Sequence, residues 1–418
     1  MYPSRRDFLR LGVGSATLLA CGNTVPTFLA RSASVLAAEP KSNKGNILVV
    51  VQLDGGNDGL NTVVPYKDEL YKKHRPRVNL AAAQGLHKID DRVAFHPSLG
   101  GFAKLLQNRQ LALVQSVGYP NPNRSHFESM AIWHTAKLKP GAETPGWLAR
   151  CLDQRRMDPG GDVPALHISD TLLPEALAGG QRHIPSLNSL EHFRRRLGVP
   201  ETAGAAQQRG VLDQLSSLEH GEPGSLLQFV ERSTLITYAS SARLEGILHG
   251  KAAPTGYPEF YGLAQRLRLI AQLIKAGLTT SIYYTQIGGF DTHANQLGTH
   301  ANLMQEVGSS LQAFMDDLTK AGDGKRVMAL VFSEFGRRLP DNASNGTDHG
   351  TAAPVFLLGG GVKPGVHGPY PNLQDLDAGG DPKHAIDFRQ VYAATLDKWL
   401  GCSSEAVLAG KFAALPVI

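Results

Sequence analysis

Residues 327–365 read VMALVFSEFGRRLPDNASNGTDHGTAAPVFLLGGGVKPG, and the pattern of this stretch decides which fold we expect. Its first six residues form an apolar run that stops just before Glu334, which is typical of a buried parallel strand. A polar loop follows, ends in Asp348 and His349, and leads into a second apolar run that enters three glycines. In open α/β sheets, functional groups gather at the carboxyl ends of strands. We therefore expect Glu334, Asp348 and His349 to lie at such an edge.

The rest of the chain alternates between strand-like and helix-like segments. Apolar, β-branched runs predict strands, and amphipathic or charged segments predict helices. Strands are expected at 46–53, 111–117, 165–168 and 281–287, and helices at 125–133, 260–276, 300–320 and after 382. This alternation favours an α/β fold with a mainly parallel sheet and helices on both faces. Between about 185 and 250 no strand is evident, and we expect a helical insertion or cap.

Length and composition indicate a folded chain with one large or two ordinary domains. The 418 residues include 42% hydrophobic and 19% charged residues, which permits a sizeable core and argues against disorder. The formal net charge is +5, but several of the positive charges lie in the N-terminal segment. The net charge is therefore weak support for nucleic-acid binding. The chain carries no nucleic-acid-binding motif, and we expect no nucleic acid as a partner.

The N-terminus resembles an export signal. Arg5 and Arg6 precede a mild, Gly/Ala-rich apolar run, which is typical of signals for the twin-arginine translocase. Small residues at the end of this segment suit signal peptidase, so we expect 1–38 to be the signal and 39–418 the periplasmic or secreted domain. The alternative is a lipid anchor on Cys21, because the residues before it resemble a lipobox. No other stretch has the roughly 18 consecutive apolar residues that a membrane span needs.

Two cysteines remain in the expected mature chain, Cys151 and Cys402. Neither belongs to a CxxC pair. They either form a disulfide in an oxidising periplasm or serve as buried apolar side chains, and the sequence leaves both interpretations open.

Three of the expected strands end in carboxylates, namely Asp54, Asp291 and Glu334. His293 lies two residues after Asp291, and His349 follows in the loop beyond Glu334. Carboxylates that crowd at one sheet edge repel one another unless protons or a cation neutralise them. Oxygen and imidazole ligands together suit Zn²⁺, Mn²⁺ or a related divalent ion. The pattern therefore predicts a metal site, with the capping of turns as the alternative role for each acid.

Arg124 and Ser125 follow the second expected strand, where prolines prevent a helix until about Ser125. As an N-cap, Ser125 would simply begin the next helix. The alternative role is catalytic, because a serine at a helix N-terminus lies where backbone amides attract an anion. Arg124 would then help to bind that anion.

Several motifs together resemble a known family. The Asp-Gly-Gly end of the first strand, Arg-Ser-His-Phe, Gly-Gly-Phe-Asp-Thr-His, Phe-Ser-Glu-Phe-Gly-Arg and Asp-His-Gly-Thr look like the bacterial exported family known as domain of unknown function 1501. The resemblance covers nearly all of the mature chain. That family is similar in turn to the alkaline phosphatase and sulfatase superfamily. The resemblance implies a three-layer α/β/α sandwich, a nucleophile after an early strand, and one or two metal ions held by Asp and His at strand ends.

Carried over to this chain, the resemblance makes Asp54 the first metal aspartate and Ser125 the nucleophile. Asp291 and His293 resemble the later Asp and His pair, although that superfamily usually spaces them wider. His349 resembles the histidine that precedes the final sheet strand.

The chain departs from the superfamily at one position. Where the superfamily usually has adjacent Asp and His residues after a strand, this chain has Glu334 and Phe335, and the aromatic ring cannot ligate. An alternative register uses Asp348 and His349 as that pair and His367 as the last ligand. We prefer the first register because Glu334 directly ends a strand.

Together these features predict an exported, metal-dependent hydrolase of phosphate or sulfate esters. Ser125 would attack the ester and Arg124 would pair with its anionic group. The alternative is a non-catalytic periplasmic protein with a degenerate metal site, which acts in polysaccharide or exported-protein assembly. The chain has no GxSxG, GxxxxGK[ST] or HExxH motif, which argues against other common chemistries.

Overall fold

The computed structural model describes residues 45–155, 162–182, 184–187 and 256–418. The expected signal, 1–38, lies outside these residues, as does all but the first part of the insertion expected at 185–250. Among the described residues, no helix combines the length and the apolar character that crossing a bilayer requires.

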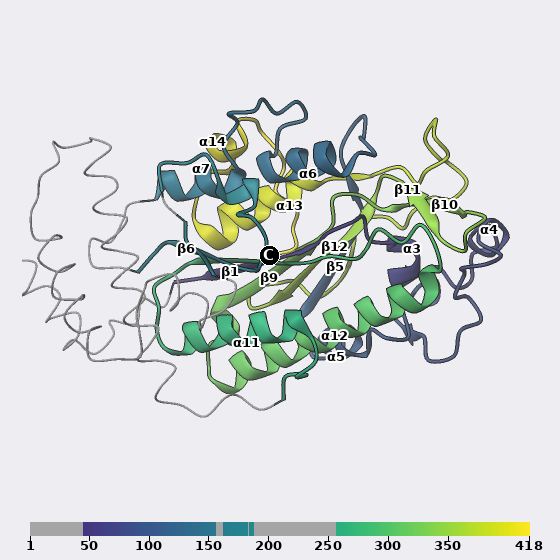
Figure 1. The fold of residues 1–418 in the computed structure, drawn as a ribbon, viewed down its shortest axis with the longest axis horizontal. Helices are drawn as coiled ribbons and strands as arrows, with labels where there is room; N and C mark the ends of the chain where they lie inside the picture. The colour runs from purple at the N-terminus through teal and green to yellow at the C-terminus, as the bar shows by residue number, and fades with distance from the viewer. Residues whose placement is uncertain (1–44, 156–161, 183, 188–255) are drawn as a thin grey trace, which may run out of the picture. The chain divides into compact units, whose positions relative to one another are not determined.

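The central sheet is mainly parallel, as the sequence predicts (Figure 1). In the described part of the chain its strands run in the order β13-β5-β12-β9-β1-β8-β6-β7, and β14 pairs with β5 outside this path. Their bounds are β1 Ile47–Leu53, β5 Leu111–Gly118, β6 Ala165–Ile168, β7 Ser186–Leu187, β8 Ile282–Ile287, β9 Val327–Phe332, β12 Ala353–Gly359, β13 Gly365–His367 and β14 Ile386–Asp387. Every pair is parallel except the two that β12 makes, with β5 and β9.

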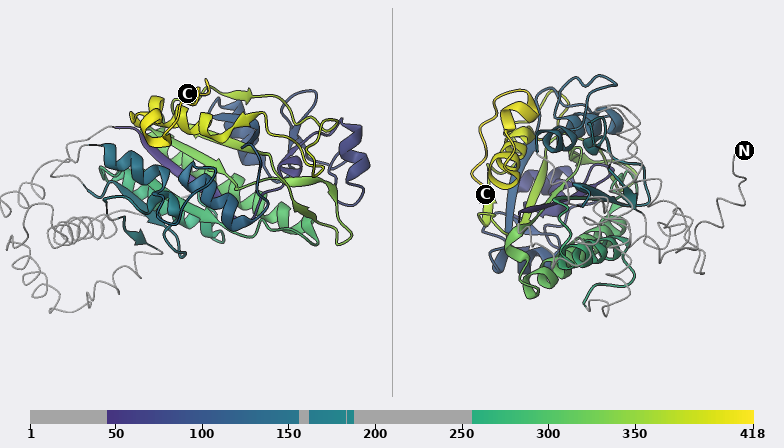
Figure 2. Two further views of the ribbon diagram at one scale, coloured as in Figure 1. Left: turned by 90° about the horizontal axis from the view of Figure 1, so that it is seen from above. Right: turned by 90° about the vertical axis from the view of Figure 1, so that its left-hand side faces the viewer.

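Helices cover both faces of the sheet, because side chains of β1 alternate between two hydrophobic cores. Val49 and Val51 pack in one core with α5, α11 and α12, and Leu48 and Val50 pack in the other with α6, α7, α13, η4 and α14. Figures 1 and 2 show the two helical layers with the sheet between them, which is a three-layer α/β/α sandwich. The helix bounds are α5 Gly100–Gln107, α6 His126–Thr135, α7 Trp147–Gln154, α11 Gly262–Lys275, α12 Gln296–Lys320, α13 Phe388–Ala394, η4 Thr395–Leu400 (a π-helix) and α14 Ser404–Leu408.

The register of the central strands brings their carboxyl ends to one edge. β1 lies between β9 and β8, with Gln52 opposite Phe332 and Leu53 opposite Ile287. The three loops that follow these strands therefore start side by side, as expected for parallel neighbours.

The segment between β9 and β12, which we expected to be a polar loop, contains a short antiparallel hairpin. Strand β10 (Arg337–Asp341) pairs with β11 (Thr347–His349). Asp348 therefore lies in a strand and not in a loop. The Asn342 side chain accepts two amide N–H groups within the turn and so stabilises the hairpin. Because this segment is rich in Gly, Ser and Asn, its hydrophobicity pattern does not indicate the two strands.

Smaller elements occupy the connections. Between β1 and α5, a three-stranded sheet of order β2-β4-β3 accompanies two short helices. The bounds are α3 Gly59–Thr62, β2 Val63–Val64, α4 Glu69–His74, β3 His87–Lys88 and β4 Ala94–Phe95, and two 3-10 helices elsewhere are η2 Glu175–Leu177 and η3 Gly324–Arg326.

The two remaining cysteines form a disulfide. Cys151 lies in α7 and Cys402 follows η4, and their Cα atoms are 6.0 Å apart. Of the two roles that the sequence left open, the disulfide is the one that the structure contains.

Candidate metal centre

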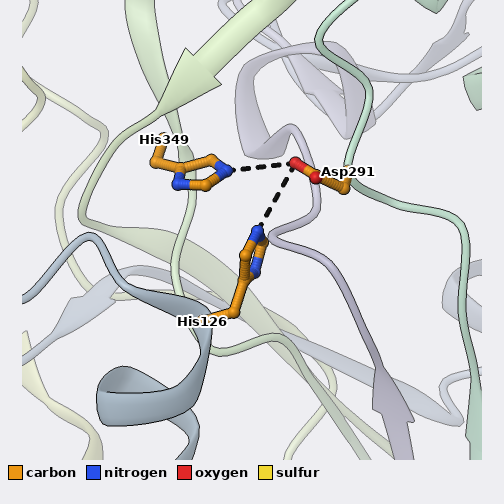
Figure 3. Close-up of side chains that lie close together, drawn as sticks. All are labelled: His126, Asp291 and His349. Atoms are coloured by element: carbon orange, nitrogen blue, oxygen red, sulfur yellow. Dashed lines mark hydrogen bonds and ion pairs between the residues drawn. The ribbon is translucent and has the colours of Figure 1, made fainter.

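Three side chains from separate parts of the chain converge at the carboxyl edge of the sheet (Figure 3). His126 is the first residue of α6, Asp291 follows β8, and His349 ends β11. One potential ligand atom from each lies within 4.8 Å of the other two. The Asp291 Oδ1 atom lies 3.0 Å from His349 Nε2 and 3.5 Å from His126 Nε2. This group is the core of the candidate centre.

A third imidazole adjoins the group. His293 Nε2 lies 3.1 Å from Asp291 Oδ1 and 2.8 Å from His349 Nε2. His293 thus contacts two members of the group, Asp291 and His349.

The opposite nitrogen of each imidazole contacts an oxygen acceptor. The Nδ1 contacts are His126 to Glu334 Oε1 at 2.8 Å, His293 to Asp348 Oδ1 at 3.0 Å, and His349 to the Arg124 carbonyl at 2.8 Å. These acceptors favour a proton on each Nδ1, because a carboxylate or carbonyl oxygen cannot donate. In the neutral rings, each Nε2 then presents its lone pair to the centre, which is how metal-binding histidines are usually oriented.

Lone pairs that face one another need a proton or a cation between them. His293 Nε2 and His349 Nε2 are in hydrogen-bond range of each other, and the buried His126 Nε2 has no hydrogen-bond partner. Imidazole and carboxylate donors in this number suit Zn²⁺ or a related divalent ion. The residues therefore fit a metal of the kind that the sequence predicts.

Buried Arg337 holds the three loops in place. Its Nε donates to the Gly56 carbonyl at 2.7 Å and its Nη1 to the Thr347 carbonyl at 2.8 Å. Its Nη2 donates to the Phe290 carbonyl at 2.9 Å and to Asp291 Oδ1 at 2.8 Å. One guanidinium thus joins the segments that follow β1 and β8 to strand β11.

The electrostatics keep Asp291 ionised. Burial alone would raise the pKa of Asp291, but the Arg337 guanidinium that donates to it, together with the neighbouring histidines, lowers this pKa to about 2. The hydrogen bond to Glu334 raises the pKa of His126 above its ordinary value. An ionised carboxylate among imidazoles is the charge arrangement that a divalent cation requires.

Of the six residues predicted as metal ligands, Asp291, His293 and His349 face the centre. Asp348 contacts the outer nitrogen of His293, as described above. Glu334 is buried and accepts hydrogen bonds from the Gly55 amide at 2.9 Å and from Ser333 Oγ at 3.0 Å. Both acids therefore orient imidazoles from outside the centre.

The sixth residue predicted as a ligand, Asp54, is not part of the group around Asp291 and lies near Glu334. Its Oδ1 accepts from Gln52 Nε2 at 3.3 Å. Burial, and the charge of Glu334, raise the pKa of Asp54.

The two residues predicted to be catalytic, Arg124 and Ser125, come directly before His126 in the sequence. Ser125 is the N-cap of α6, and its side chain makes no capping hydrogen bond. The Arg124 guanidinium pairs with Asp381 and with Asp377, the latter at 3.2 Å. Its carbonyl is the acceptor that orients His349.

Sequence reasoning missed His126. This histidine belongs to the Arg-Ser-His-Phe motif, but the functional role in that motif was assigned to the neighbouring Ser125. Buried Phe335 packs against this centre, with its ring centroid 4.9 Å from that of His126 and 5.0 Å from that of His349. His367, the last ligand in the alternative register, lies on β13 opposite Val114, within β5 and before the end of that strand.

Comparison with known proteins confirms the family resemblance. Residues 46–411 match the model of a family described as "Protein of unknown function (DUF1501)". No relative is found among curated proteins. 

Similar solved structures include the expected superfamily. The PsFucS1 sulfatase from Pseudoalteromonas sp. is 11% identical, with 94% of this chain and 78% of that chain covered and a TM-score of 0.38. A protein in the alkaline phosphatase superfamily from Vibrio parahaemolyticus is 8% identical, with coverages of 82% and 72% and a TM-score of 0.35. The lipoteichoic acid synthase LtaP from Listeria monocytogenes is 11% identical, with coverages of 81% and 73% and a TM-score of 0.37.

Proposed function

This chain belongs to the DUF1501 family, which has no assigned function, and we propose that it is an exported, metal-dependent hydrolase of phosphate or sulfate esters. The observation that carries the proposal is the convergence of three imidazole Nε2 atoms on the ionised Asp291. Each imidazole has its other nitrogen held by an oxygen acceptor. Imidazole nitrogens and a carboxylate oxygen in this arrangement suit a divalent cation, which supports the proposal.

The ligands that we assign are His126, Asp291, His293 and His349. A divalent ion bound there would act as a Lewis acid toward an ester oxygen. Glu334 keeps His126 in the tautomer whose lone pair faces inward, and its buried position makes that orientation rigid.

Ser125 is the attacking group in this proposal. It lies at the N-terminus of α6, directly beside His126, where unpaired backbone amides attract a phosphate or sulfate group. Its hydroxyl oxygen would form a bond to phosphorus or sulfur while the bond to the alcohol oxygen breaks, and the alcohol would leave with the serine proton. Water would then cleave the ester on Ser125, which releases phosphate or sulfate and restores the hydroxyl. The proposed esters are anionic, and Arg124 stays a candidate for binding them because its side chain is 39% exposed.

One observation favours the non-catalytic alternative. Phe335 stands where the superfamily resemblance expects a metal histidine, and its buried ring packs on His126 and His349. A protein with this replacement could bind a metal and an anionic polymer without turnover. Activity measurements on the metal-loaded protein separate the two functions.

Elemental analysis of the purified protein, followed by Zn²⁺ titration of chelated protein, tests the centre. We expect about one zinc ion per chain in the wild type and weakened binding, by at least about 100-fold, in Asp291→Ala or His126→Ala, since each removes a ligand. His367→Ala is the matched control, because this half-buried histidine of β13 contacts the Lys363 carbonyl. Zinc binding that survives both ligand variants would exclude this centre.

A panel of phosphate and sulfate monoesters then tests the reaction. We expect turnover by the zinc-loaded wild type and a loss of at least about 100-fold in Ser125→Ala, with zinc binding retained. A protein that binds zinc but hydrolyses no ester would support the non-catalytic alternative.

A further inference from the structure

We propose that Gln296 is a positioning residue that sets the spacing between the two segments 291–293 and 347–349. These segments supply three of the four assigned ligands. The inference rests on the proposed metal centre, but its geometric part concerns the protein without metal. Gln296 is the first residue of α12, and its side chain is buried.

A single oxygen of Gln296 joins the two segments. Its Oε1 accepts a hydrogen bond from Thr292 Oγ1 at 3.0 Å and another from Thr347 Oγ1 at 2.6 Å. Thr292 lies between Asp291 and His293, and Thr347 begins the strand that ends in His349. Because an amide oxygen has two lone pairs, the two hydroxyl groups satisfy it fully. Both threonines are buried, so water does not compete for these bonds.

The other end of the amide fixes its orientation. Gln296 Nε2 donates to Asp58 Oδ2 at 2.5 Å, and Asp58 Oδ2 pairs with Arg75 Nη1 at 2.6 Å. An ionised carboxylate only accepts, so the NH₂ group must face Asp58 and the oxygen must face the threonines. The buried ion pair thereby keeps the acceptor of Gln296 directed at the ligand-bearing segments.

Backbone contacts place this side chain between the segments. The amides of Asn295 and Gln296 donate to the carbonyls of Ser344 and Asn345, at 3.0 and 2.9 Å, in the turn of the β10–β11 hairpin. The Thr347 amide donates to the Thr292 carbonyl at 3.2 Å. The start of α12 thus lies against both segments at once.

This position matters because metal ligands tolerate little displacement. Productive coordination requires ligand atoms within about 0.5 Å of their places, and losing a supporting hydrogen bond typically weakens metal binding by about 10–100-fold. His293 and His349, whose Nε2 atoms are 2.8 Å apart, come from different sides of the Gln296 bridge. Removing the bridge would allow these two rings to separate.

The test compares Gln296→Met with Gln305→Met. Methionine keeps the length of glutamine and removes the amide, and Gln305 is an exposed residue of the same helix. We expect Gln296→Met to weaken Zn²⁺ binding by about 10–100-fold and Gln305→Met to leave it unchanged. Crystal structures of the metal-free proteins should show the His293 to His349 Nε2 separation longer than 2.8 Å in Gln296→Met alone.

A second variant covers the case in which Gln296→Met does not fold. Thr347→Val removes one hydroxyl with little change of shape, and we expect it to weaken zinc binding and widen the same separation. If both variants fold, the double variant should bind zinc no more weakly than Gln296→Met, because Gln296→Met already removes the hydrogen bond through which the Thr347 hydroxyl acts.

The outcomes separate this inference from the proposed function. A wild type without zinc affinity would refute the metal centre, and the metal-free structures would still decide the role of Gln296. An unchanged histidine separation in Gln296→Met, or in Thr347→Val if the former is unfolded, would overturn the positioning role.

Discussion

At the residue scale, the polar groups of this protein differ in how much they depend on a partner. In the candidate centre, the Asp291 side chain is 48% exposed, so water can replace a lost contact. Arg75 and Asp58, in contrast, form an ion pair at 2.6 Å with both side chains fully buried. Arg75 also donates to the Leu339 and Arg338 carbonyls. Removing one member of such a pair leaves the other charge without compensation.

Arg75→Met should therefore lower the free energy of unfolding by about 3–5 kcal/mol at pH 7. Burial alone would raise the pKa of Asp58, but Arg75 lowers it below its ordinary value of 3.8. Because the folded pKa lies below the unfolded one, the pair stabilises the fold above pH 3.8, and this contribution is lost as the pH falls. Urea unfolding should show a smaller difference between variant and wild type at pH 3 than at pH 7.

Lys72→Met is the control for this prediction. Its side chain is 39% exposed and lies 2.7 Å from Glu69, which is 83% exposed, so its removal should cost less than about 1 kcal/mol. A deficit in Arg75→Met that is equally small, or that grows toward pH 3, would contradict the role of the buried pair.

At the scale of elements, the β10–β11 hairpin decides the shape of the candidate centre. The hairpin delivers His349, and its turn packs against the segment that carries His293. The approach is close at Gly346, where an added Cβ would lie 2.2 Å from the backbone carbon of His293. Any side chain at this position must push the hairpin away from the neighbouring segment.

We therefore expect Gly346→Ala to reduce stability by about 1–3 kcal/mol and to weaken zinc binding, since the two histidine-bearing segments must separate. Denaturant unfolding and zinc titration measure the two effects. Gly298→Ala is the matched control, because a Cβ at this exposed position of α12 meets no heavy atom within 4 Å. That change should instead stabilise the protein by about 0.5–1 kcal/mol, as alanine does in a helix. Wild-type zinc affinity in Gly346→Ala would show that the centre does not need the close approach.

At the scale of the whole molecule, the disulfide joins distant parts of the chain. Cys151 and Cys402 are separated by 251 residues, and both lie in the helical layer formed by α7 and the C-terminal helices. A cross-link over so long a loop restricts the unfolded chain strongly. Stable disulfides are typical of exported proteins.

A reducing agent should lower the stability of the wild type by about 2–4 kcal/mol. The double variant Cys151→Ala/Cys402→Ala should show the reduced stability under both conditions and no response to the reducing agent. Urea unfolding with and without dithiothreitol measures both. An equal response of wild type and double variant would show that the effect does not come from this disulfide.

Most of the layered fold was predictable, because each buried parallel strand is a continuous apolar run. The strands expected at 46–53, 111–117 and 281–287 agree with β1, β5 and β8 to within one residue at each end. The helix expected to begin at about 300 begins four residues earlier, at Gln296. Its N-cap, Asn295, makes no side-chain capping hydrogen bond, so the usual capping interaction does not mark this start. Export by the twin-arginine translocase stays a prediction.

The sequence by itself determined which segments are buried and which acids end the strands, since apolar runs and the polar residues that stop them are local features. Only the tertiary structure decided which side chains share a centre. His126 joins Asp291 and His349 because strand order and the placement of α6 bring together residues far apart in the chain. Strand order also places the Glu334 carboxylate next to His126 Nδ1, on the side of the ring that faces away from Asp291. The hydrophobic pattern of a segment indicates whether that segment is buried. Its neighbours in the fold are determined by strand pairing and long-range hydrogen bonds.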